Sequence, residues 1–292
     1  MKGSLRRCLS EQKDLVIVTV EARDVLQELC TRLQASPPAM LHLGHAAMAT
    51  LLVQALNDPK ESESIELQWA LTGPFGNMNA YSEEFGKFRA SISKPEVMSE
   101  TLAMPLGPGT FQCRKVKDGI VTSGIVASQG SVNEDLEEYF DKSEQKVAAM
   151  GLSLQFEFDE SLGQEQPFRI SKALGYLVHL LPDEQGVSEG RIVNMDSHLR
   201  QLGPLTQWVL DHDSAMATLT MARFLSGSLK AKELDETAIE VKCRCTRDRV
   251  LNALSLLTTR EKKYFLQDKD NEALLVNCEY CGKEYRILDS EI

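Results

Sequence analysis

Two cysteine pairs near the C-terminus, Cys243-Arg244-Cys245 and Cys278-Glu279-Tyr280-Cys281-Gly282, decide how the last part of the chain folds. Residues 246 to 277 separate the pairs, and an insert of this size lets all four thiols converge. Four thiolates in a tetrahedron are the usual ligands of structural zinc. We therefore predict that one zinc ion per chain is bound by Cys243, Cys245, Cys278 and Cys281.

The insert between the pairs contains residues that are typical of helix N-termini. Thr246 is placed to cap a helix that carries Val250 and Leu254, and the run Thr258–Glu261 fits a capping box for a second helix. Residues 273–276 and 284–287 have the composition of strands. About sixty terminal residues are too few to stay folded by apolar burial alone. Zinc binding is expected to add roughly 10–16 kcal/mol at neutral pH.

The first pair points beyond a structural role. It is a Cys-x-Cys, whereas structural zinc knuckles usually contain Cys-x-x-Cys, and its sulfurs are near enough to join. Zinc keeps thiols in the thiolate form that oxidants attack, and Arg244, Arg247 and Arg249 add positive charge nearby. Oxidation would release the metal together with the free energy that folds the domain. The pattern favours a redox switch, with a purely structural zinc site as the alternative.

Composition excludes other classes of protein. A net charge of -11 and a pI near 5.1 argue against constitutive nucleic-acid binding, which needs a basic footprint. The sequence has no apolar run of about 18 residues, so we predict no membrane span. We expect a cytoplasmic protein, because Glu11 to Asp14 interrupt any apolar signal core behind the basic N-terminus. Thiols stay reduced in that compartment, so the clustered cysteines are interpreted as metal ligands or redox sensors. The scattered Cys8, Cys30 and Cys113 are interpreted as ordinary core or surface residues with no role in the zinc site or the switch.

The preceding residues mix helix and strand periodicity, which predicts an α+β fold. Residues 16–20 and the alternation in 65–71 indicate strands, while residues 23–33 and 39–56 indicate helices. Further strands are expected at 87–93, 110–115, 120–126, 153–158 and 175–181, and a helix at 133–149.

Residues 184–233 change character. Ile192, Met195, Leu199 and Leu202 recur at helical spacing, but no strand is predicted there. Short helices are marginally stable alone, so this segment must dock on a neighbour. We therefore expect three parts: an N-terminal α+β core at 1–183, a metastable helical linker at 184–233 and a C-terminal zinc-binding redox-switch domain at 234–292.

Several motifs resemble the heat-shock protein 33 family, redox-regulated holdase chaperones of bacteria and some organelles. The two cysteine-containing runs, 241–249 and 278–285, are similar to that family's signature, and Leu136–Gln145 is an independent match. Weaker similarity covers 73–76 and 177–182. Leu174 and Val241 depart from the family pattern, at positions where glycine and an aromatic residue are common. The resemblance spans essentially the whole chain.

The resemblance implies a specific function and no enzymatic activity. Reduced protein would hold Zn²⁺ on the four cysteines and be inactive. Oxidation would form Cys243–Cys245 and Cys278–Cys281 disulfides, release zinc and unfold the linker. Exposed apolar surface would then bind unfolded or partly folded client proteins without ATP, as an oxidative-stress response. The resemblance leaves a homodimer open for the oxidised state and implies no nucleic-acid or membrane partner.

Other interpretations are weaker. A zinc-ribbon nucleic-acid-binding regulatory protein is the main alternative, since ribbons share paired cysteines, but the acidity disfavours it. Catalytic zinc needs an open coordination position, which four thiolates do not leave. The run 186–190 matches the hydrolase pattern Gly-x-Ser-x-Gly around Ser188, with Asp211 and His212 downstream, yet residues 182–185 separate it from any strand. His42 and His45 have a metal-compatible spacing but are more simply packed in an apolar helix.

Overall fold

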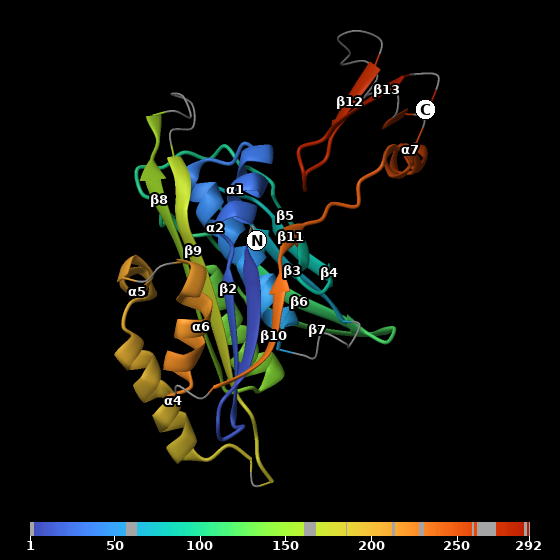
Figure 1. Cartoon of the computed structure of the whole chain (residues 1–292). Helices are drawn as coiled ribbons and strands as arrows, with labels where there is room; N and C mark the ends of the chain where they lie inside the picture. The colour runs from blue at the N-terminus through green and yellow to red at the C-terminus, as the bar shows by residue number, and fades with distance from the viewer. Residues whose placement is uncertain are drawn as a thin grey trace. The chain divides into compact units, whose positions relative to one another are not determined.

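The chain folds into two compact units, Met1–Val241 and Lys242–Ile292. The computed structural model describes residues 3–56, 63–160, 168–184, 186–211, 214–227, 231–258, 260–261, 273–288 and 291. Figure 1 shows the elements of both units. None of the helices within these residues is long and apolar enough to cross a membrane.

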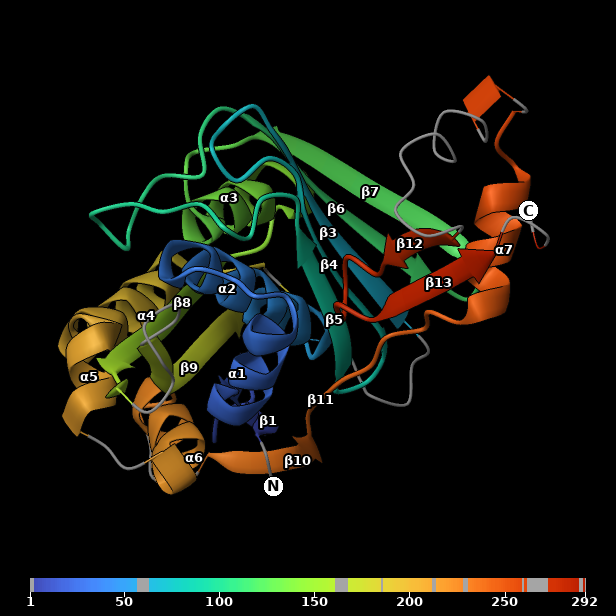
Figure 2. The same ribbon diagram turned by 90° about the horizontal axis from the view of Figure 1, so that it is seen from above.

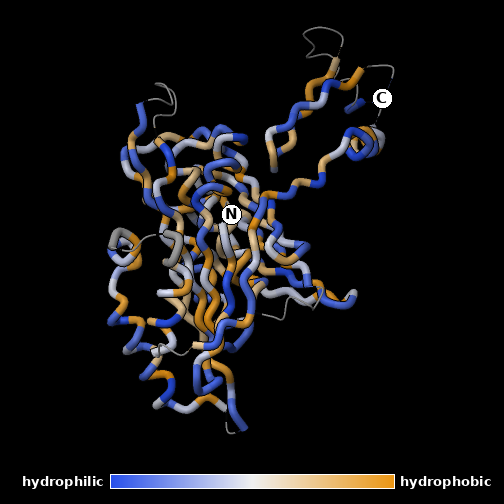
Figure 3. Tube along the Cα trace, viewed as in Figure 1, coloured by the Kyte–Doolittle hydropathy of each residue, from blue (hydrophilic) through white to orange (hydrophobic). Residues whose placement is uncertain are grey.

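A five-stranded antiparallel sheet forms the first layer of unit 1. Its strand order is β10 (Lys232–Ala238), β1 (Ser4–Leu9), β2 (Leu15–Glu21), β9 (Phe168–Leu180) and β8 (Ala148–Phe158). The run 15–20 in β2 is buried throughout. Val16, Val18 and Val20 face one core and Leu15 and Ile17 another. This strand reads as a continuous apolar run because both sheet faces are covered, and Figure 3 shows apolar stretches along the strands of unit 1.

A six-stranded sheet forms the second layer. Its order is β11 (Glu240–Val241), β5 (Lys87–Ile92), β4 (Met78–Glu84), β3 (Glu63–Leu71), β6 (Gly109–Lys117) and β7 (Ile120–Ala127). Ile65, Leu67 and Trp69 of β3 are buried while the residues between them are less so. The predicted alternation is confirmed, because only one face of this sheet packs on the core.

Helix α2 (Pro37–Gln54) lies between the two sheets and contacts strands of both (Figure 2). It is buried on nearly all sides, which explains why its sequence is apolar throughout rather than amphipathic. Helix α1 (Arg23–Arg32) packs beside it and on β9. Together the two sheets and α2 enclose the main hydrophobic core.

The predicted linker contains helices α4 (Glu189–Leu202), α5 (Leu205–Asp211) and α6 (Ser214–Leu225). They cover the other face of the five-stranded sheet and build a second core with it. Met195, Trp208 and Met221 of the helices join Leu174 of β9 there. Leu174, one of the two departures from the family pattern, is thus a buried contact of the linker.

Two sequence predictions for unit 1 need correction. The helix expected at 133–149 is shorter: α3 (Val132–Tyr139) passes into a π-helical turn, η1 (Phe140–Glu144), and Gln145 then adopts a left-handed φ of 51°. Residues from Ala148 onward pair with β9 instead. The zinc domain does not begin at 234 either, because β10 pairs with β1 and β11 with β5. Strands β1, β4, β10 and β11 were not predicted.

Unit 2 is small. It contains helix α7 (Arg247–Ser255) and the hairpin of β12 (Ala273–Asn277) and β13 (Glu284–Leu288). As predicted, Thr246 caps α7 by accepting a hydrogen bond from the backbone N–H of Arg249. The capping-box contacts of Thr258 and Glu261 are also present. The helix expected to follow them lies mostly outside the described residues.

Candidate metal centre

Two loops of unit 2 carry the four cysteines. Cys243 and Cys245 lie between β11 and α7, and Cys278 and Cys281 lie in the turn that joins β12 to β13. The backbone N–H of Cys281 and that of Gly282 both donate to the carbonyl of Cys278, at 3.3 and 2.8 Å. Gly282 has a φ of +66°, the left-handed conformation that lets the turn close tightly.

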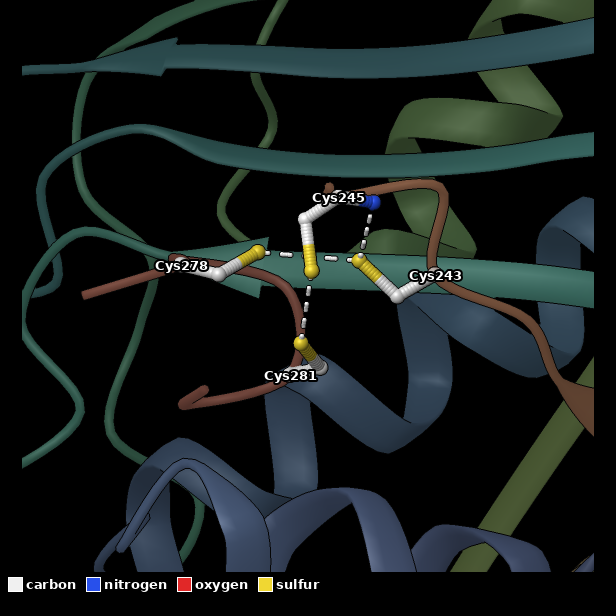
Figure 4. Close-up of side chains that lie close together, drawn as sticks. All are labelled: Cys243, Cys245, Cys278 and Cys281. Carbon is white, nitrogen blue, oxygen red and sulfur yellow. Dashed lines mark hydrogen bonds between the residues drawn. The ribbon is translucent and has the colours of Figure 1, made fainter. Parts of the chain in front are cut away.

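All four Sγ atoms lie within 4.8 Å of one another. Two of the contacts join the two loops: Cys243 Sγ to Cys278 Sγ is 3.6 Å, and Cys245 Sγ to Cys281 Sγ is 3.4 Å (Figure 4). Sulfurs bound at about 2.3 Å to one tetrahedral ion stand about 3.8 Å apart, whereas disulfide sulfurs are about 2.05 Å apart. The observed spacing therefore fits four ligands of one metal ion.

Hydrogen bonds stabilise negative charge on the cluster. The backbone N–H of Cys245 donates to Cys243 Sγ at 3.4 Å, and the hydroxyl of Tyr285 donates to Cys245 Sγ at 3.1 Å. Burial opposes ionisation of Cys245, but the hydrogen bonds from Tyr285, Cys281 and Cys243 lower the pKa of its thiol to about 7. Burial raises the pKa values of Cys243 and Cys281. Of these three thiols, Cys245 is therefore the one that ionises most readily.

The donor set fits zinc. Four thiolates complete a tetrahedron and leave no open position for a substrate, so the site has the composition of a structural or redox-responsive centre rather than a catalytic one. A bound divalent cation would offset the mutual repulsion of four neighbouring thiolates.

The nearby arginines are less available than the sequence suggested. Arg247 forms a bidentate ion pair with Glu291, with contacts of 2.6 and 2.8 Å from its Nη2. Arg249 donates to the carbonyl of Arg244 at 3.1 Å. Tyr285 and Glu291 are the residues that the sequence analysis missed here. Tyr285 gave a signal, since it stands within the second cysteine motif.

The other cysteines do not belong to this centre. Cys8, Cys30 and Cys113 are each fully buried in unit 1. Burial raises the pKa of Cys8 and of Cys113 to about 11 and that of Cys30 to about 12. Protonated, enclosed thiols are poor nucleophiles and poor ligands.

The remaining candidate sites have packing explanations. His42 Nε2 lies 2.6 Å from the carbonyl of Met104, and its ring packs edge-on against Phe75 at 4.7 Å. His45 is enclosed in α2, and burial lowers its pKa to about 3. Ser188 precedes α4, eight residues after β9 ends at Leu180, so it is no nucleophile elbow. His212 lies outside the described residues. Among the residues that are described, only the four-cysteine cluster gathers three or more metal-binding side chains.

Comparisons with known proteins agree with this arrangement. The chain is similar to a 33 kDa chaperonin of Thermus thermophilus, with 28% identity over 99% of this chain and 85% of the relative. The 33 kDa chaperonin of Desulfotalea psychrophila is 24% identical, over 100% of this chain and 96% of that protein. The crystal structure of the 33 kDa chaperonin (heat shock protein 33 homolog) from Thermotoga maritima superposes with a TM-score of 0.83 at 20% identity, covering 100% of this chain and 96% of that one. The family model described as Hsp33 protein matches residues 3–288. The match includes both cysteine motifs and both units, so the chain belongs to the Hsp33 family, as the sequence motifs predicted.

Proposed function

We propose that this protein is an ATP-independent holdase chaperone that is inactive when reduced and zinc-bound. Peroxide activates it by forming disulfides, which releases one zinc ion per chain and unfolds the linker at 184–233. The active form binds unfolded or partly folded proteins and prevents their aggregation during oxidative stress. We place this activity in the cytoplasm.

The observation that carries the proposal is a four-thiol cluster in a unit whose described residues form only a very small core. Among its described residues, unit 2 buries the apolar residues Ala273, Tyr285 and Ile287, and α7 buries none. Complete burial of one large apolar side chain contributes about 1.5–3 kcal/mol. Zinc binding at about 10–16 kcal/mol would therefore exceed the apolar contribution, so folding of unit 2 depends on the metal.

The proposed chemistry uses the pairs within each motif, as the family resemblance implies. Cys243 would join Cys245, and Cys278 would join Cys281. For each bond, two thiols give up two electrons and two protons to one peroxide molecule, which becomes two water molecules. A disulfide sulfur has lost the thiolate charge that holds a cation, so both loops would release the metal.

The linker at 184–233 is suited to undock when the zinc is released. Its helices span 14, 7 and 12 residues, and isolated helices of such length are marginal in water. They hold to the sheet mainly through the second core, where Met195, Trp208 and Met221 are buried. Undocking would expose those side chains together with Ile17 and Val178 of the sheet. A flexible, Met-containing apolar surface is suited to varied partners.

Zinc content and free thiols, measured on the same sample, test the proposal. Freshly reduced protein should contain one zinc per chain. Peroxide at elevated temperature should remove four thiols and release the zinc in step, while suppression of aggregation of a heat-denatured test protein increases. Peptide mapping should find Cys243–Cys245 and Cys278–Cys281. Reduced protein without zinc, or full chaperone activity before oxidation, would contradict the proposal.

The same peptide mapping detects intermolecular disulfides, and light scattering shows whether the oxidised protein is a homodimer.

A further inference from the structure

Strand β7 is an exposed sheet edge without charge. It forms one end of the six-stranded sheet and reads Ile-Val-Thr-Ser-Gly-Ile-Val-Ala. Ile120, Val121 and Ile125 are 68%, 51% and 60% exposed. In the described part of the chain no strand pairs with its outer side, and in Figure 2 it is the outermost strand of this sheet. An exposed, uncharged edge with apolar side chains is a template for another strand.

The other three edge strands of unit 1 each have a feature that limits pairing with a further strand. Strand β10 is rich in charge, and its Asp235 and Glu236 form ion pairs with Arg7 and Arg6 of β1. Strand β8 is covered by α5, with Gln155 donating to the carbonyl of Thr206 at 2.6 Å. Strand β11 has two residues. Charge, cover and shortness are the usual means of blocking unwanted pairing, and β7 has none of them.

The hairpin geometry shows which backbone groups face outward. Asp118 and Gly119 have φ values of 51° and 79°, the pattern of a two-residue type I′ turn. Such a turn makes its flanking residues, Lys117 and Ile120, a hydrogen-bonded pair, and bonding then alternates along the strand. Residues 122 and 124 therefore bond to β6. Residues 121, 123 and 125 turn their N–H and C=O groups to the open side.

The side chains of these outward-bonding residues share one sheet face. A Cβ on Gly124 would collide with Tyr139 and Ser143, so the face of residue 124 packs on α3 and η1. Val121 and Ile125 lie on the opposite face, because side chains alternate along a strand. An added strand would therefore find free backbone groups and two exposed apolar side chains together.

We propose that the open edge of β7 binds extended, apolar segments of unfolded polypeptides by strand addition. This inference rests on the proposed chaperone function and adds a site on unit 1. Backbone pairing requires no particular sequence, while Val121 and Ile125 favour apolar residues at alternate positions of the bound segment. Such a site suits a protein that holds many different clients.

A second copy of this chain is a poorer occupant. Stable interfaces use about 20–30 residues a side, whereas β7 offers the 8 residues from Ile120 to Ala127. A client segment can bind through a smaller contact area at β7, because the apolar surface of an undocked linker would bind the same client at other points. Two weak sites on one chaperone give combined affinity greater than either alone.

Amide hydrogen exchange of the full-length oxidised protein, with and without reduced and carboxymethylated lysozyme as the unfolded probe, tests the edge directly. The amides of Val121, Ser123 and Ile125 should slow at least tenfold in the complex. Those of Thr122 and Gly124 should change little, because they already bond to β6. Unchanged exchange at all three outward amides would overturn the proposal.

Two further comparisons separate backbone pairing from adhesion to side chains. A seven-residue peptide of alternating valine and threonine should bind, and its twin with every peptide nitrogen methylated should bind at least tenfold more weakly. Equal binding of the twins would refute strand addition. The variant Val121→Lys with Ile125→Lys should lose peptide affinity tenfold or more. The control Ile120→Lys removes an apolar side chain that is more exposed than either of these. The backbone of Ile120 faces β6, so the peptide affinity of this variant should stay within twofold of the parent's.

These outcomes are independent of the redox proposal. Both lysine variants should keep the parent's zinc content and thiol loss, since the switch lies in unit 2. If the oxidised parent suppresses aggregation but shows no alternate amide protection, strand addition fails and the holdase function stands. If the edge amides are protected but aggregation is not suppressed, the edge stands and the holdase function fails.

Discussion

Tyr285 donates a hydrogen bond from its hydroxyl to Cys245 Sγ, at an Oη–Sγ distance of 3.1 Å. Tyr285 belongs to β13 and is one of three buried apolar side chains among the described residues of unit 2. The same residue therefore connects the small core of this unit to its thiol cluster. Packing in the core and ionisation of the cysteines depend on each other through this contact.

We expect Tyr285→Phe to weaken zinc binding about tenfold, within the range for loss of a partner that orients a metal ligand. Removal of the hydroxyl also raises the pKa of Cys245 in the metal-free reduced protein, since this hydrogen bond favours the thiolate. Competition with a chromophoric chelator measures the affinity. Tyr81→Phe is the matched control, because the hydroxyl of Tyr81 bonds to Glu66 in unit 1. Equal zinc affinity of the two variants would show that the contact has no role in metal binding.

The buried histidine of α2 predicts how the stability of unit 1 depends on pH. Burial, reinforced by His42, lowers the pKa of His45 from 6.5 to about 3. Between these values the unfolded chain binds a proton that the folded chain does not. The free energy of unfolding therefore falls as pH decreases below 6.5, by up to about 1.4 kcal/mol per pH unit for this group. Urea unfolding between about pH 5 and pH 8 measures how the free energy of unfolding changes with pH, and this change should be smaller in His45→Gln than in the parent. An equal pH dependence in the variant and the parent would contradict the assignment to His45.

Local patterns predicted most elements, and long-range contacts account for the errors. Strand β2, helices α1 and α2, and the hairpin around the second cysteine pair follow their periodicity. The run 147–150 is apolar enough for a helix, but its pairing with β9 decides its conformation. Strand β10 is charged and largely exposed, so its sequence gives no strand signal. Its partner Arg6 is more than two hundred positions away.

The thiol cluster was the most predictable part of the site, because chemistry restricts which residues can hold a metal. The two spacings predicted that the four sulfurs converge, and in the structure they do. The support from Tyr285 and the Arg247–Glu291 pair depends on the folded hairpin and the chain end. Tyr285 stands within the second cysteine motif, so the sequence drew attention to it, whereas the Arg247–Glu291 pair has no local sequence pattern that would predict it.

The three cysteines of unit 1 should be dispensable for the switch. We expect the triple variant Cys8→Ala, Cys30→Ala, Cys113→Ala to bind one zinc and to lose four thiols to peroxide as the parent does. Each change removes a buried side chain, so the free energy of unfolding should fall by about 1 kcal/mol per site. Metal analysis and thiol titration test the first expectation, and urea unfolding tests the second. Loss of peroxide activation in a folded triple variant would place the redox centre among these residues.

The docking of the linker should set how readily the chaperone activates. Met221 of α6 is fully buried in the second core, and Met40 of α2 is buried as deeply in the main core. Either Met→Ala change should cost about 2–5 kcal/mol through the cavity it leaves. Only Met221→Ala removes that stability from the linker. Amide hydrogen exchange over residues 189–225 of this variant should therefore be faster already in the reduced, zinc-bound protein, and suppression of aggregation should begin at a lower peroxide concentration.

In the parent, oxidation should raise hydrogen exchange in the linker while residues 3–160 largely keep their protection. An oxidised protein that held clients with its linker still protected would contradict the undocking mechanism, even with the chaperone function intact.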